Sequence, residues 1–241
     1  MTKIKNLQKK AVVVHSGGMD SSICLALAIE KLGAENVLSM TFTYGQRHTE
    51  EIAQAKQINE DWGVDHVVVN LDCLQQITES SLLDKKLAIK HGKSEKSPNT
   101  MVVGRNGLMA RVASIHADFL GANNIYMGVI ELEEANSGYR DCSRKYMDIV
   151  QAALRVDFAN PDFEIQTPLV FMTKKQTMDA AYQMGKLEYL LENTISCYEG
   201  ISGYGCGKCP ACELRNEGIQ EYLNHNPDIQ FSYKNKFTLP R

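Results

Sequence analysis

A glycine turn between an apolar run and a helix-like segment constrains this chain more than any other feature. The run Ala11–Val14 leads through the string SGGMDS (16–21) into Ile23–Leu32, whose apolar residues recur with helical periodicity. This order predicts a strand, a tight turn and a helix start, where backbone N–H groups can bind phosphate. Two adjacent glycines allow φ > 0 and close approach to a ligand, and Asp20 can cap the helix or hold Mg²⁺. An ordinary βα turn is the simpler alternative, but the complete string favours phosphate binding.

Short apolar runs alternate with helix-like stretches through most of the chain. Such alternation is typical of a parallel sheet covered by helices, so the sequence predicts an α/β fold with a five-stranded parallel sheet and helices on both faces. Ligands of these sheets bind outside the carboxyl ends of the strands, where SGGMDS and the later string YGQRH (44–48) would both lie. The predicted strands are Ala11–Val14, Val37–Phe42, His66–Asn70, Ile125–Gly128 and Phe163–Gln166, and the predicted helices are Ser22–Leu32, Thr49–Trp62, Gly107–Leu120, Arg144–Val156, Lys174–Met184 and Glu213–Leu223.

Two segments interrupt this alternation, and a third part follows it. Asp72–Thr100 is long and polar, which predicts an insertion and a candidate lid over the site. Glu131–Tyr139 is acidic and follows a strand end, so we expect it to contact a substrate. The pattern changes near residue 170. We therefore divide the chain into an α/β nucleotide-binding domain, residues 1–170, and a C-terminal helical segment, residues 171–241, with a cysteine-rich loop and a polar tail.

Composition and charge argue against several classes of protein. The 241 residues are 44% hydrophobic and 23% charged, with a formal net charge of −3 and a sequence pI of about 6.1. This balance is typical of a soluble globular protein and gives no basic footprint for nucleic acid. No window is apolar for long enough to span a membrane, and the basic start MTKIKNLQKK lacks the apolar stretch of a signal peptide. We therefore expect a cytoplasmic protein without a membrane or nucleic-acid partner.

Four of the seven cysteines crowd into sixteen residues near the C-terminal end. Their spacing on a glycine-rich loop fits tetrahedral Zn²⁺ bound by four thiolates, with no position left open for water, which favours a structural role. An iron–sulfur cluster and four reduced cysteines without a metal are the alternatives. The predicted ligands are Cys197, Cys206, Cys209 and Cys212.

Several strings together resemble one enzyme family. SGGMDS after the first strand is similar to the pyrophosphate loop of the PP-loop ATPases, which have an adenine-nucleotide α-hydrolase-like, Rossmann-like fold. The other strings narrow this resemblance to the 7-cyano-7-deazaguanine synthase (QueC) family, over a region from about Ala11 to Leu223. These strings are YGQRH (44–48), GRN (104–106), SGY (137–139), DC (141–142), TPL (167–169) and CYEGISGYGCGKCPACELR (197–215).

The resemblance implies an ATP-dependent ligase. Enzymes of this family adenylate the carboxylate of 7-carboxy-7-deazaguanine and let ammonia displace AMP, and a second ATP drives dehydration of the amide to the nitrile. The resemblance further implies ATP, Mg²⁺ and Zn²⁺ as cofactors, and a homodimer. The implied catalytic residues are Asp20, Ser21, Arg105 and Lys174. The implied nucleotide-binding residues are His15, Ser16, Gly17, Gly18, Met19, Asp20, Ser21, Ser22, Ile23, Cys24, Leu25, Phe42 and Tyr44. The implied substrate-binding residues are Arg47, Arg105, Asn106, Ser137, Gly138, Tyr139 and Asp141.

Departures near the implied substrate site keep an alternative open. Val103 and Arg140 stand where the family pattern has proline, and the string GVIELEEANSGYRDC (128–142) is slightly longer than the family's. The alternative is a QueC-like ligase that transfers the activated acyl group to another amine, such as one on a protein, in a modification or defence pathway. A catalytically silent ATP-binding subunit is less favoured because Asp20 and Ser21 are present. A tRNA-thiolating PP-loop enzyme is less favoured because the charge balance is acidic.

Overall fold

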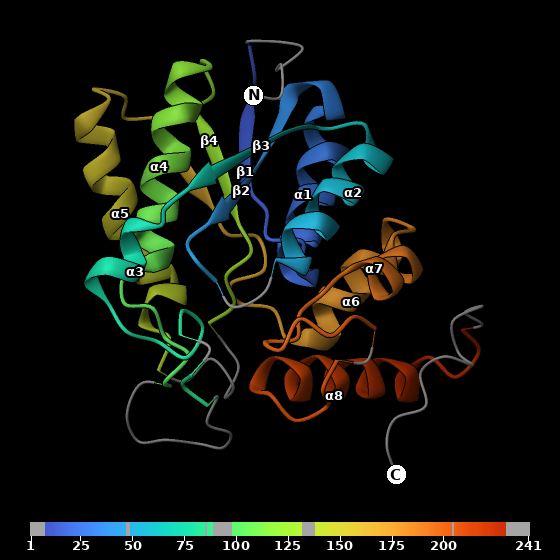
Figure 1. Ribbon diagram of the computed structural model, residues 1–241. Helices are drawn as coiled ribbons and strands as arrows, with labels where there is room; N and C mark the ends of the chain where they lie inside the picture. The colour runs from blue at the N-terminus through green and yellow to red at the C-terminus, as the bar shows by residue number, and fades with distance from the viewer. Residues whose placement is uncertain are drawn as a thin grey trace.

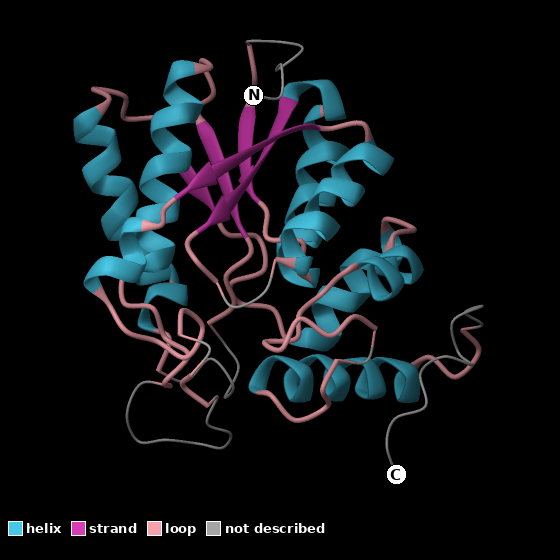
Figure 2. Ribbon diagram, in the orientation of Figure 1, coloured by secondary structure: helices cyan, strands magenta, loops and turns pink. Residues whose placement is uncertain are grey.

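The computed structural model describes residues 8–46, 49–84, 86–88, 98–131, 138–203 and 205–229 of the chain. Its centre is a five-stranded sheet in the order β3-β2-β1-β4-β5, in which every neighbouring pair is parallel. Helices lie on both faces of this sheet (Figures 1 and 2), so the predicted fold class is confirmed. The strands are β1 (Ala11–Val14), β2 (Val37–Thr43), β3 (Asp65–Asn70), β4 (Asn124–Met127) and β5 (Glu164–Gln166).

The central strand β1 separates two hydrophobic cores. Its residues alternate between the two faces of the sheet, so Val12 belongs to one core and Ala11 and Val13 belong to the other. A short run of apolar, mostly branched residues suits a strand that is covered on both sides. The Val12 face is covered by α4 (Arg105–Phe119) and α5 (Arg144–Asp157), and the opposite face by α1 (Met19–Leu32) and α2 (Glu50–Trp62), as the two sides of Figure 1 show.

The C-terminal helices extend the core on the α1 face. These helices, α6 (Lys174–Gln183), α7 (Leu187–Asn193) and α8 (Pro210–His225), lie below α1 in Figure 1. Met178, Leu190 and Ile219, one from each helix, belong to the same buried cluster as Ile23 of α1. The C-terminal segment is therefore packed directly against the sheet domain. The predicted boundary at residue 170 stays a prediction.

The structure differs from the predicted elements mainly at helix starts and in short helices. The glycine turn leads directly into α1, which begins at Met19 and not at Ser22. The start of α8 lies at Pro210, before the predicted Glu213, because proline suits the first turn of a helix. Helices α3 (Cys73–Ile77) and α7 were not predicted, since segments this short carry little periodic signal. The described residues also include the 3₁₀ helices η1 (Ala34–Asn36) and η3 (Arg140–Cys142).

The predicted insertion, Asp72–Thr100, is only partly described. Its described residues contain α3 and place Leu74 and Leu82 in the core on the α4 side of the sheet. Ser80 and Ser81 are buried as well. Residues 85 and 89–97 lie outside the described residues, so the lid stays a prediction.

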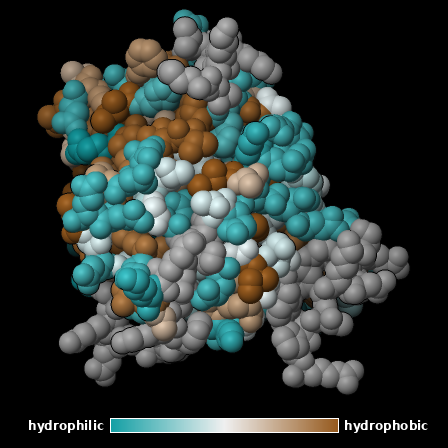
Figure 3. All heavy atoms as spheres, in the orientation of Figure 1, coloured by the Kyte–Doolittle hydropathy of each residue, from teal (hydrophilic) through white to brown (hydrophobic). Residues whose placement is uncertain are grey.

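Some apolar side chains remain on the surface around β3 and α4. Val68 of β3 and Ile115 and Phe119 of α4 are exposed, and apolar side chains gather on the upper part of the face seen in Figure 3. Among the described residues, no helix has the length and apolar character needed to cross a membrane. The homodimer and the cytoplasmic location stay predictions.

The strand order determines where a ligand can bind. The chain adds β2 and β3 on one side of β1, and then β4 and β5 on the other. Because the loops that leave β1 and β4 turn toward opposite faces of the sheet, a crevice opens outside the carboxyl ends of these two strands. The glycine turn after β1 lies at this crevice.

Candidate active site

A cavity of about 310 Å³ opens at the carboxyl ends of β1, β2 and β4. Val14, Phe42 and Met127, at the ends of these three strands, form part of its lining. Residues from α1, α2, α4, α6 and α8 complete the walls. The cavity therefore lies at the crevice that the strand order predicts.

The SGGMDS turn, called here the phosphate loop (residues 16–21), is held by hydrogen bonds between its own residues. Ser21 Oγ accepts from the backbone N of Ser16 at 3.1 Å and donates to the carbonyl of Gly18 at 3.0 Å. Ser16 Oγ lies 3.0 Å from Ser21 Oγ and accepts from the backbone N of Gly18 at 3.2 Å. The two serines therefore fix the loop from within.

The N-cap residue of α1 supplies no side-chain cap to the first turn. This residue is Gly18, whereas Ser143 and Thr173 cap α5 and α6 with their hydroxyl oxygens. Uncapped N–H groups at a helix N-terminus carry partial positive charge and favour a bound anion. Because this end of α1 borders the cavity, it is suited to bind an anionic group.

Two glycines let the phosphate loop and α1 approach neighbouring backbone. Gly17 has a φ of 83°, and a Cβ at this position would lie 2.3 Å from the carbonyl oxygen of Glu51. Gly128, directly after β4, packs against α1, where a Cβ would lie 2.8 Å from the backbone N of Ser21. A larger residue at either position would force the backbone to move.

His15 supports the phosphate loop from behind, where it is fully buried. Its Nε2 lies 2.9 Å from Ser22 Oγ, which itself donates to the carbonyl of Gly18 at 2.8 Å, so Nε2 carries the ring proton and donates it. Nδ1 then accepts from Ser39 Oγ and Asn59 Nδ2, both at 3.2 Å. Burial lowers the pKa of His15 to about 3, so the ring is neutral and holds one tautomer.

Asp20 and Lys174 form an ion pair on the cavity wall. Lys174 Nζ donates to both carboxylate oxygens of Asp20 at 2.6 Å, joining the first residue of α6 to the first turn of α1. Gly218 of α8 allows close packing here, because a Cβ at this position would lie 2.4 Å from Lys174 Cβ. A cation and a carboxylate thus stand beside the uncapped helix start, where a phosphate and its counter-ion would bind.

Arg105, at the start of α4, brings a second cation to the cavity. Its Nη1 donates to the hydroxyl of Tyr44 at 3.1 Å, and its guanidinium lies 5.2 Å from the centroid of that ring. Burial alone would lower the pKa of Arg105, but Tyr44 and Asp141 nearby more than offset it, so the pKa is raised. The guanidinium is fully charged and can receive an anionic group.

Two tyrosines add hydroxyl groups beside Arg105. The Tyr139 hydroxyl contacts Thr100 Oγ1 and lies 3.4 Å from the Tyr198 hydroxyl. Burial raises the pKa of Tyr198 well above its usual value, so this hydroxyl stays protonated. Burial also raises the pKa of the Cys142 thiol to about 12, which disfavours a nucleophilic role for it at neutral pH.

Glu51, in the first turn of α2, places a second carboxyl group on the cavity wall. Burial raises its pKa to about 7, although Arg105 opposes this shift. A carboxyl group that titrates near neutral pH can take up and release a proton during a reaction. Glu51 is therefore chemically suited to move protons in this cavity.

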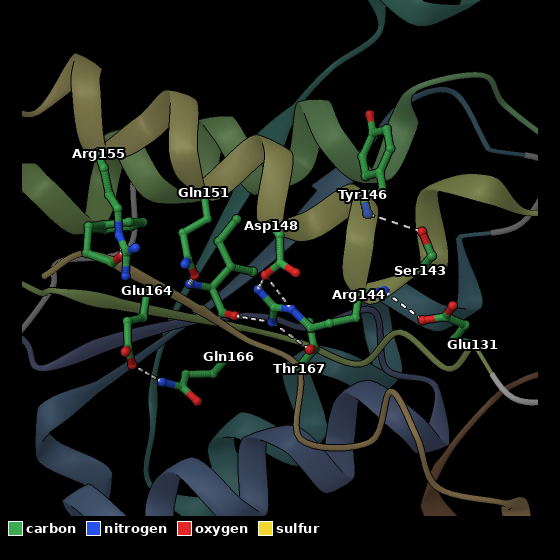
Figure 4. A network of polar contacts seen from close by, with 12 residues as sticks. Glu131, Ser143, Arg144, Tyr146, Asp148, Gln151, Arg155, Glu164, Gln166 and Thr167 are labelled. Atoms are coloured by element: carbon green, nitrogen blue, oxygen red, sulfur yellow. Dashed lines mark hydrogen bonds and ion pairs between the residues drawn. The ribbon is translucent and has the colours of Figure 1, made fainter. Parts of the chain in front are cut away.

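Arg144 ties the start of α5 to the end of β5 (Figure 4). Its Nη1 donates to the carbonyl of Ile165 at 2.7 Å and to Thr167 Oγ1 at 2.8 Å. Its Nε and Nη2 donate to Asp148 at 2.8 and 2.6 Å, and its backbone N donates to Glu131 at 2.9 Å. These bonds anchor the chain on both sides of residues 132–137, which lie outside the described residues.

The four predicted metal ligands converge. Their sulfur atoms all lie within 4.8 Å of one another, the Cys206 and Cys212 sulfurs are 4.0 Å apart, and all four thiols are free. Tetrahedral Zn–S bonds of about 2.3 Å would place sulfurs about 3.8 Å apart. Cys197 Sγ also accepts from the backbone N of Glu199 at 3.4 Å and of Cys206 at 3.3 Å, contacts that favour a thiolate. The donor set therefore fits a metal ion.

The cysteine loop, residues 197–209, begins beside the phosphate loop. Just before it, the backbone N of Ile195 donates to the carbonyl of Gly17 at 3.1 Å. Ser196 Oγ lies 3.5 Å from the backbone N of Met19, at the start of α1. The segment that carries the predicted metal ligands is thus bonded directly to the candidate phosphate site.

Comparisons with known proteins point to one family. The model of the family described as queuosine biosynthesis protein QueC matches residues 10–223. A 7-cyano-7-deazaguanine synthase from Lysinibacillus sphaericus (strain C3-41) is 39% identical over 222 residues, which cover 92% of this chain and 99% of that protein. The chain belongs to the QueC family. It is therefore an enzyme of the ligase type that the sequence strings predicted.

Two solved structures also resemble this QueC-family chain, at low identity. The U34-tRNA thiolase NcsA from Methanococcus maripaludis, solved with its 4Fe–4S cluster, gives a TM-score of 0.49 at 16% identity, covering 93% of this chain and 68% of that one. A 4-thiouridine synthetase in complex with RNA and bound ATP gives 0.48 at 18% identity, covering 91% of this chain and 51% of that one. The QueC-family chain thus spans about half the length of the 4-thiouridine synthetase.

Most of the predicted site residues lie at the cavity of this QueC-family enzyme. Asp141 adjoins it, and its Oδ2 accepts from the backbone N of Asn106 at 3.2 Å. Gly17, Ser22 and Gly138 are not among the lining residues, and Ile23, Cys24 and Leu25 lie in the buried core of α1. Arg47 and Ser137 lie outside the described residues. The predicted residues that line the cavity are His15, Ser16, Gly18, Met19, Asp20, Ser21, Phe42, Tyr44, Arg105, Asn106, Tyr139 and Lys174.

The chemically capable residues at the cavity that were not predicted include Glu51, Tyr198 and Arg215. Glu51 follows the string YGQRH by three residues, while Tyr198 and Arg215 lie inside the cysteine string. Each lies inside or beside a motif, but within the cysteine string only the four cysteines carry a predicted role.

Proposed function

We propose that this QueC-family enzyme uses ATP to adenylate the carboxylate of 7-carboxy-7-deazaguanine and joins it to ammonia. The products are 7-cyano-7-deazaguanine, AMP and pyrophosphate. The observation that carries the proposal is an uncapped helix N-terminus that shares one cavity with Lys174 and Arg105. A triphosphate and a carboxylate both need such anion-binding groups.

The first step gives the carboxylate a leaving group. A carboxylate oxygen of the substrate attacks the α-phosphorus of ATP, a new O–P bond forms, and the bond from the α-phosphorus to the bridging oxygen breaks. Pyrophosphate leaves with the negative charge. The N–H groups at the start of α1 and the ammonium of Lys174 border the same cavity, which supports assigning them to stabilise that developing charge.

The later steps form the nitrile and release protons. Ammonia attacks the acyl carbon, the C–N bond forms, the C–O bond to AMP breaks, and a proton leaves. The amide oxygen then attacks the α-phosphorus of a second ATP and pyrophosphate leaves. Loss of the two amide protons and of AMP gives the C≡N bond. We assign Glu51, with its pKa of about 7, as the carboxylate that accepts these protons.

We assign the deazaguanine to the wall formed by Arg105, Asn106 and Tyr139. Arg105 keeps its charge and can pair with the carboxylate before activation. Asn106 and Tyr139 offer donors and acceptors to the polar edge of the heterocycle. Gly138, Asp141, Arg47 and Ser137 keep their predicted roles at the same substrate, and Phe42 and Tyr44 are assigned to the adenine.

The residues present fit two kinds of metal ion. Asp20 places carboxylate oxygens on the cavity wall, which is the ligand type that Mg²⁺ prefers, and Mg²⁺ there would neutralise triphosphate charge. The four cysteines fit a structural Zn²⁺ site with every coordination position filled by sulfur. The role we assign to zinc is to hold the cysteine loop against the phosphate loop.

The proposal is tested with the purified enzyme, ATP, Mg²⁺, an ammonium salt and 7-carboxy-7-deazaguanine. We expect AMP release that depends on the carboxylate, with the amide and then the nitrile detected by mass spectrometry. Lys174→Met should abolish AMP release, while Arg111→Gln, at an exposed ion pair with Asp157, should retain it. AMP release only with another amine or a protein acceptor would replace this proposal by the acyl-transfer alternative. No AMP under any of these conditions would contradict both.

A further inference from the structure

Arg215, in the second turn of α8, is a buried cation without an acidic partner among the described residues. It is 3% exposed and borders the cavity. A guanidinium that is taken out of water is costly unless an anion pairs with it. A buried and unpaired guanidinium on a cavity wall therefore indicates that an anion binds there.

The hydrogen bonds of Arg215 leave part of its guanidinium unused. Nη2 donates to the carbonyl of Gly203 at 2.6 Å and to Asn216 Oδ1 at 3.3 Å, and Nε lies 3.4 Å from the same oxygen. Nη1 makes no hydrogen bond within the part of the chain that the structure describes. Nη1 is not completely buried, so a ligand can reach it. Its two N–H groups are free to bind a ligand in the cavity.

The position of Arg215 favours a phosphate over a carboxylate. Gly218, three residues further along α8, packs on Lys174, so Arg215 stands on the same wall as the Asp20–Lys174 pair. In Figure 1 the body of α8 lies below α6, and the start of α8 points toward the middle of the molecule, beneath the sheet. Arg105, which we assign to the substrate carboxylate, comes from α4 on the face of the sheet opposite α1.

We propose that Arg215 binds the β- and γ-phosphates of ATP and holds the pyrophosphate when it leaves. A guanidinium forms two parallel hydrogen bonds to a phosphate, which a lysine cannot do. Because the terminal phosphates supply the missing counter-charge, Arg215 should contribute little to the binding of AMP. This inference rests on the proposed function, since it needs ATP as the nucleotide.

The test compares the affinities of ATP, pyrophosphate and AMP for the wild-type enzyme and for Arg215→Gln, by titration calorimetry. We expect the affinities for ATP and pyrophosphate to fall about 10- to 100-fold, while AMP affinity changes less than about twofold. Arg215→Lys should recover part of the loss, and Arg111→Gln should behave as wild type. Zinc content and melting temperature report whether the fold is intact.

If Arg215→Gln does not fold, the wild-type enzyme still tests the proposal. Phenylglyoxal modifies accessible arginines, and pyrophosphate but not AMP should protect Arg215, as measured by peptide mass spectrometry.

In the calorimetric comparison, equal losses of affinity for ATP, pyrophosphate and AMP in Arg215→Gln would overturn the proposal in favour of a purely structural role. Weaker binding of 7-carboxy-7-deazaguanine with unchanged pyrophosphate binding would overturn it in favour of a carboxylate site. If the wild-type enzyme binds ATP and pyrophosphate and Arg215→Gln binds each of them as tightly as wild type does, this inference alone fails. If the wild-type enzyme binds neither ligand, the proposed function fails.

Discussion

Two loops meet at the cavity, and they are held in place by different means. The phosphate loop lies between a buried strand and a helix, and its own serines and the buried His15 fix its shape. The cysteine loop contains no helix or strand in its described part, and glycines 200, 203, 205 and 207 have positive φ. Its buried cluster consists of cysteines with a few partly buried neighbours. The chain itself determines the first loop, whereas the second depends on the metal that we assign to it.

Residues that flank the cysteine loop bond to the phosphate loop or border the cavity, and this makes the difference relevant to function. Ile195 donates to Gly17, and Arg215 bonds the carbonyl of Gly203 while bordering the cavity. One wall of the phosphate site is therefore set by the fold of the sheet domain, and the other wall depends on the state of the cysteine loop. Removing the metal should damage the phosphate site without unfolding the sheet.

The largest expected effect comes from breaking the cysteine loop. Cys209→Ser removes a fully buried thiol from the cluster, so the loop should lose its metal and its fixed geometry. Since metal binding and folding of such loops are coupled, we expect AMP release to fall about 100-fold or more. Zinc analysis, far-UV circular dichroism and the AMP assay measure this, and the helical signal of the sheet domain should remain.

Cys73→Ser is the matched control for this change. Cys73 is exposed in α3, away from the four clustered sulfurs, so this variant should keep its metal and its rate. An active Cys209→Ser enzyme that has lost its metal would show that the cysteine loop does not support the phosphate site. Metal analysis that finds iron would contradict the zinc assignment.

A change on the other wall should remove catalysis while leaving the fold in place. Asp20→Asn keeps the shape of the side chain but removes the charge that pairs with Lys174. We expect kcat to fall about 100-fold, because the charge balance at the phosphate site changes. The free energy of unfolding should fall by only about 1 kcal/mol, since the Asp20 side chain is partly exposed. Steady-state kinetics and urea denaturation separate the two effects, and a normal rate would remove Asp20 from the mechanism.

The sequence predicted the parts of the site that are local and missed those that are assembled by tertiary packing. The strand, turn and helix around residues 11–32 follow from neighbouring residues, so the loop and its helix were predicted nearly to their boundaries. The partners of His15 come from β2 and α2, and no local pattern indicates that Ser39 and Asn59 will meet its ring. Arg215 likewise reaches the cavity only because α8 packs on α6.

The smallest predicted effect concerns how the phosphate loop is supported. His15 titrates at about 3 in the folded protein and near 6.5 when unfolded, because burial lowers its pKa. The stability that its neutral ring provides is therefore complete above pH 6.5 and is lost as the pH falls from there toward 3. Between pH 7 and pH 5 this single group should cost the wild-type enzyme about 2 kcal/mol of unfolding free energy.

His15→Phe separates this contribution from the rest of the protein. The variant cannot titrate at this position, so its stability should fall about 2 kcal/mol less than wild type between pH 7 and pH 5. At pH 7 it should be less stable than wild type by about 1–3 kcal/mol, because Ser22, Ser39 and Asn59 lose a hydrogen-bond partner. His225→Gln, at an exposed position of α8, should keep the wild-type pH dependence in the same urea titrations. If the free energy of unfolding of wild type and of His15→Phe changed in parallel with pH, the ring would not stay neutral behind the loop. Water or a rearranged partner would then support the phosphate loop instead.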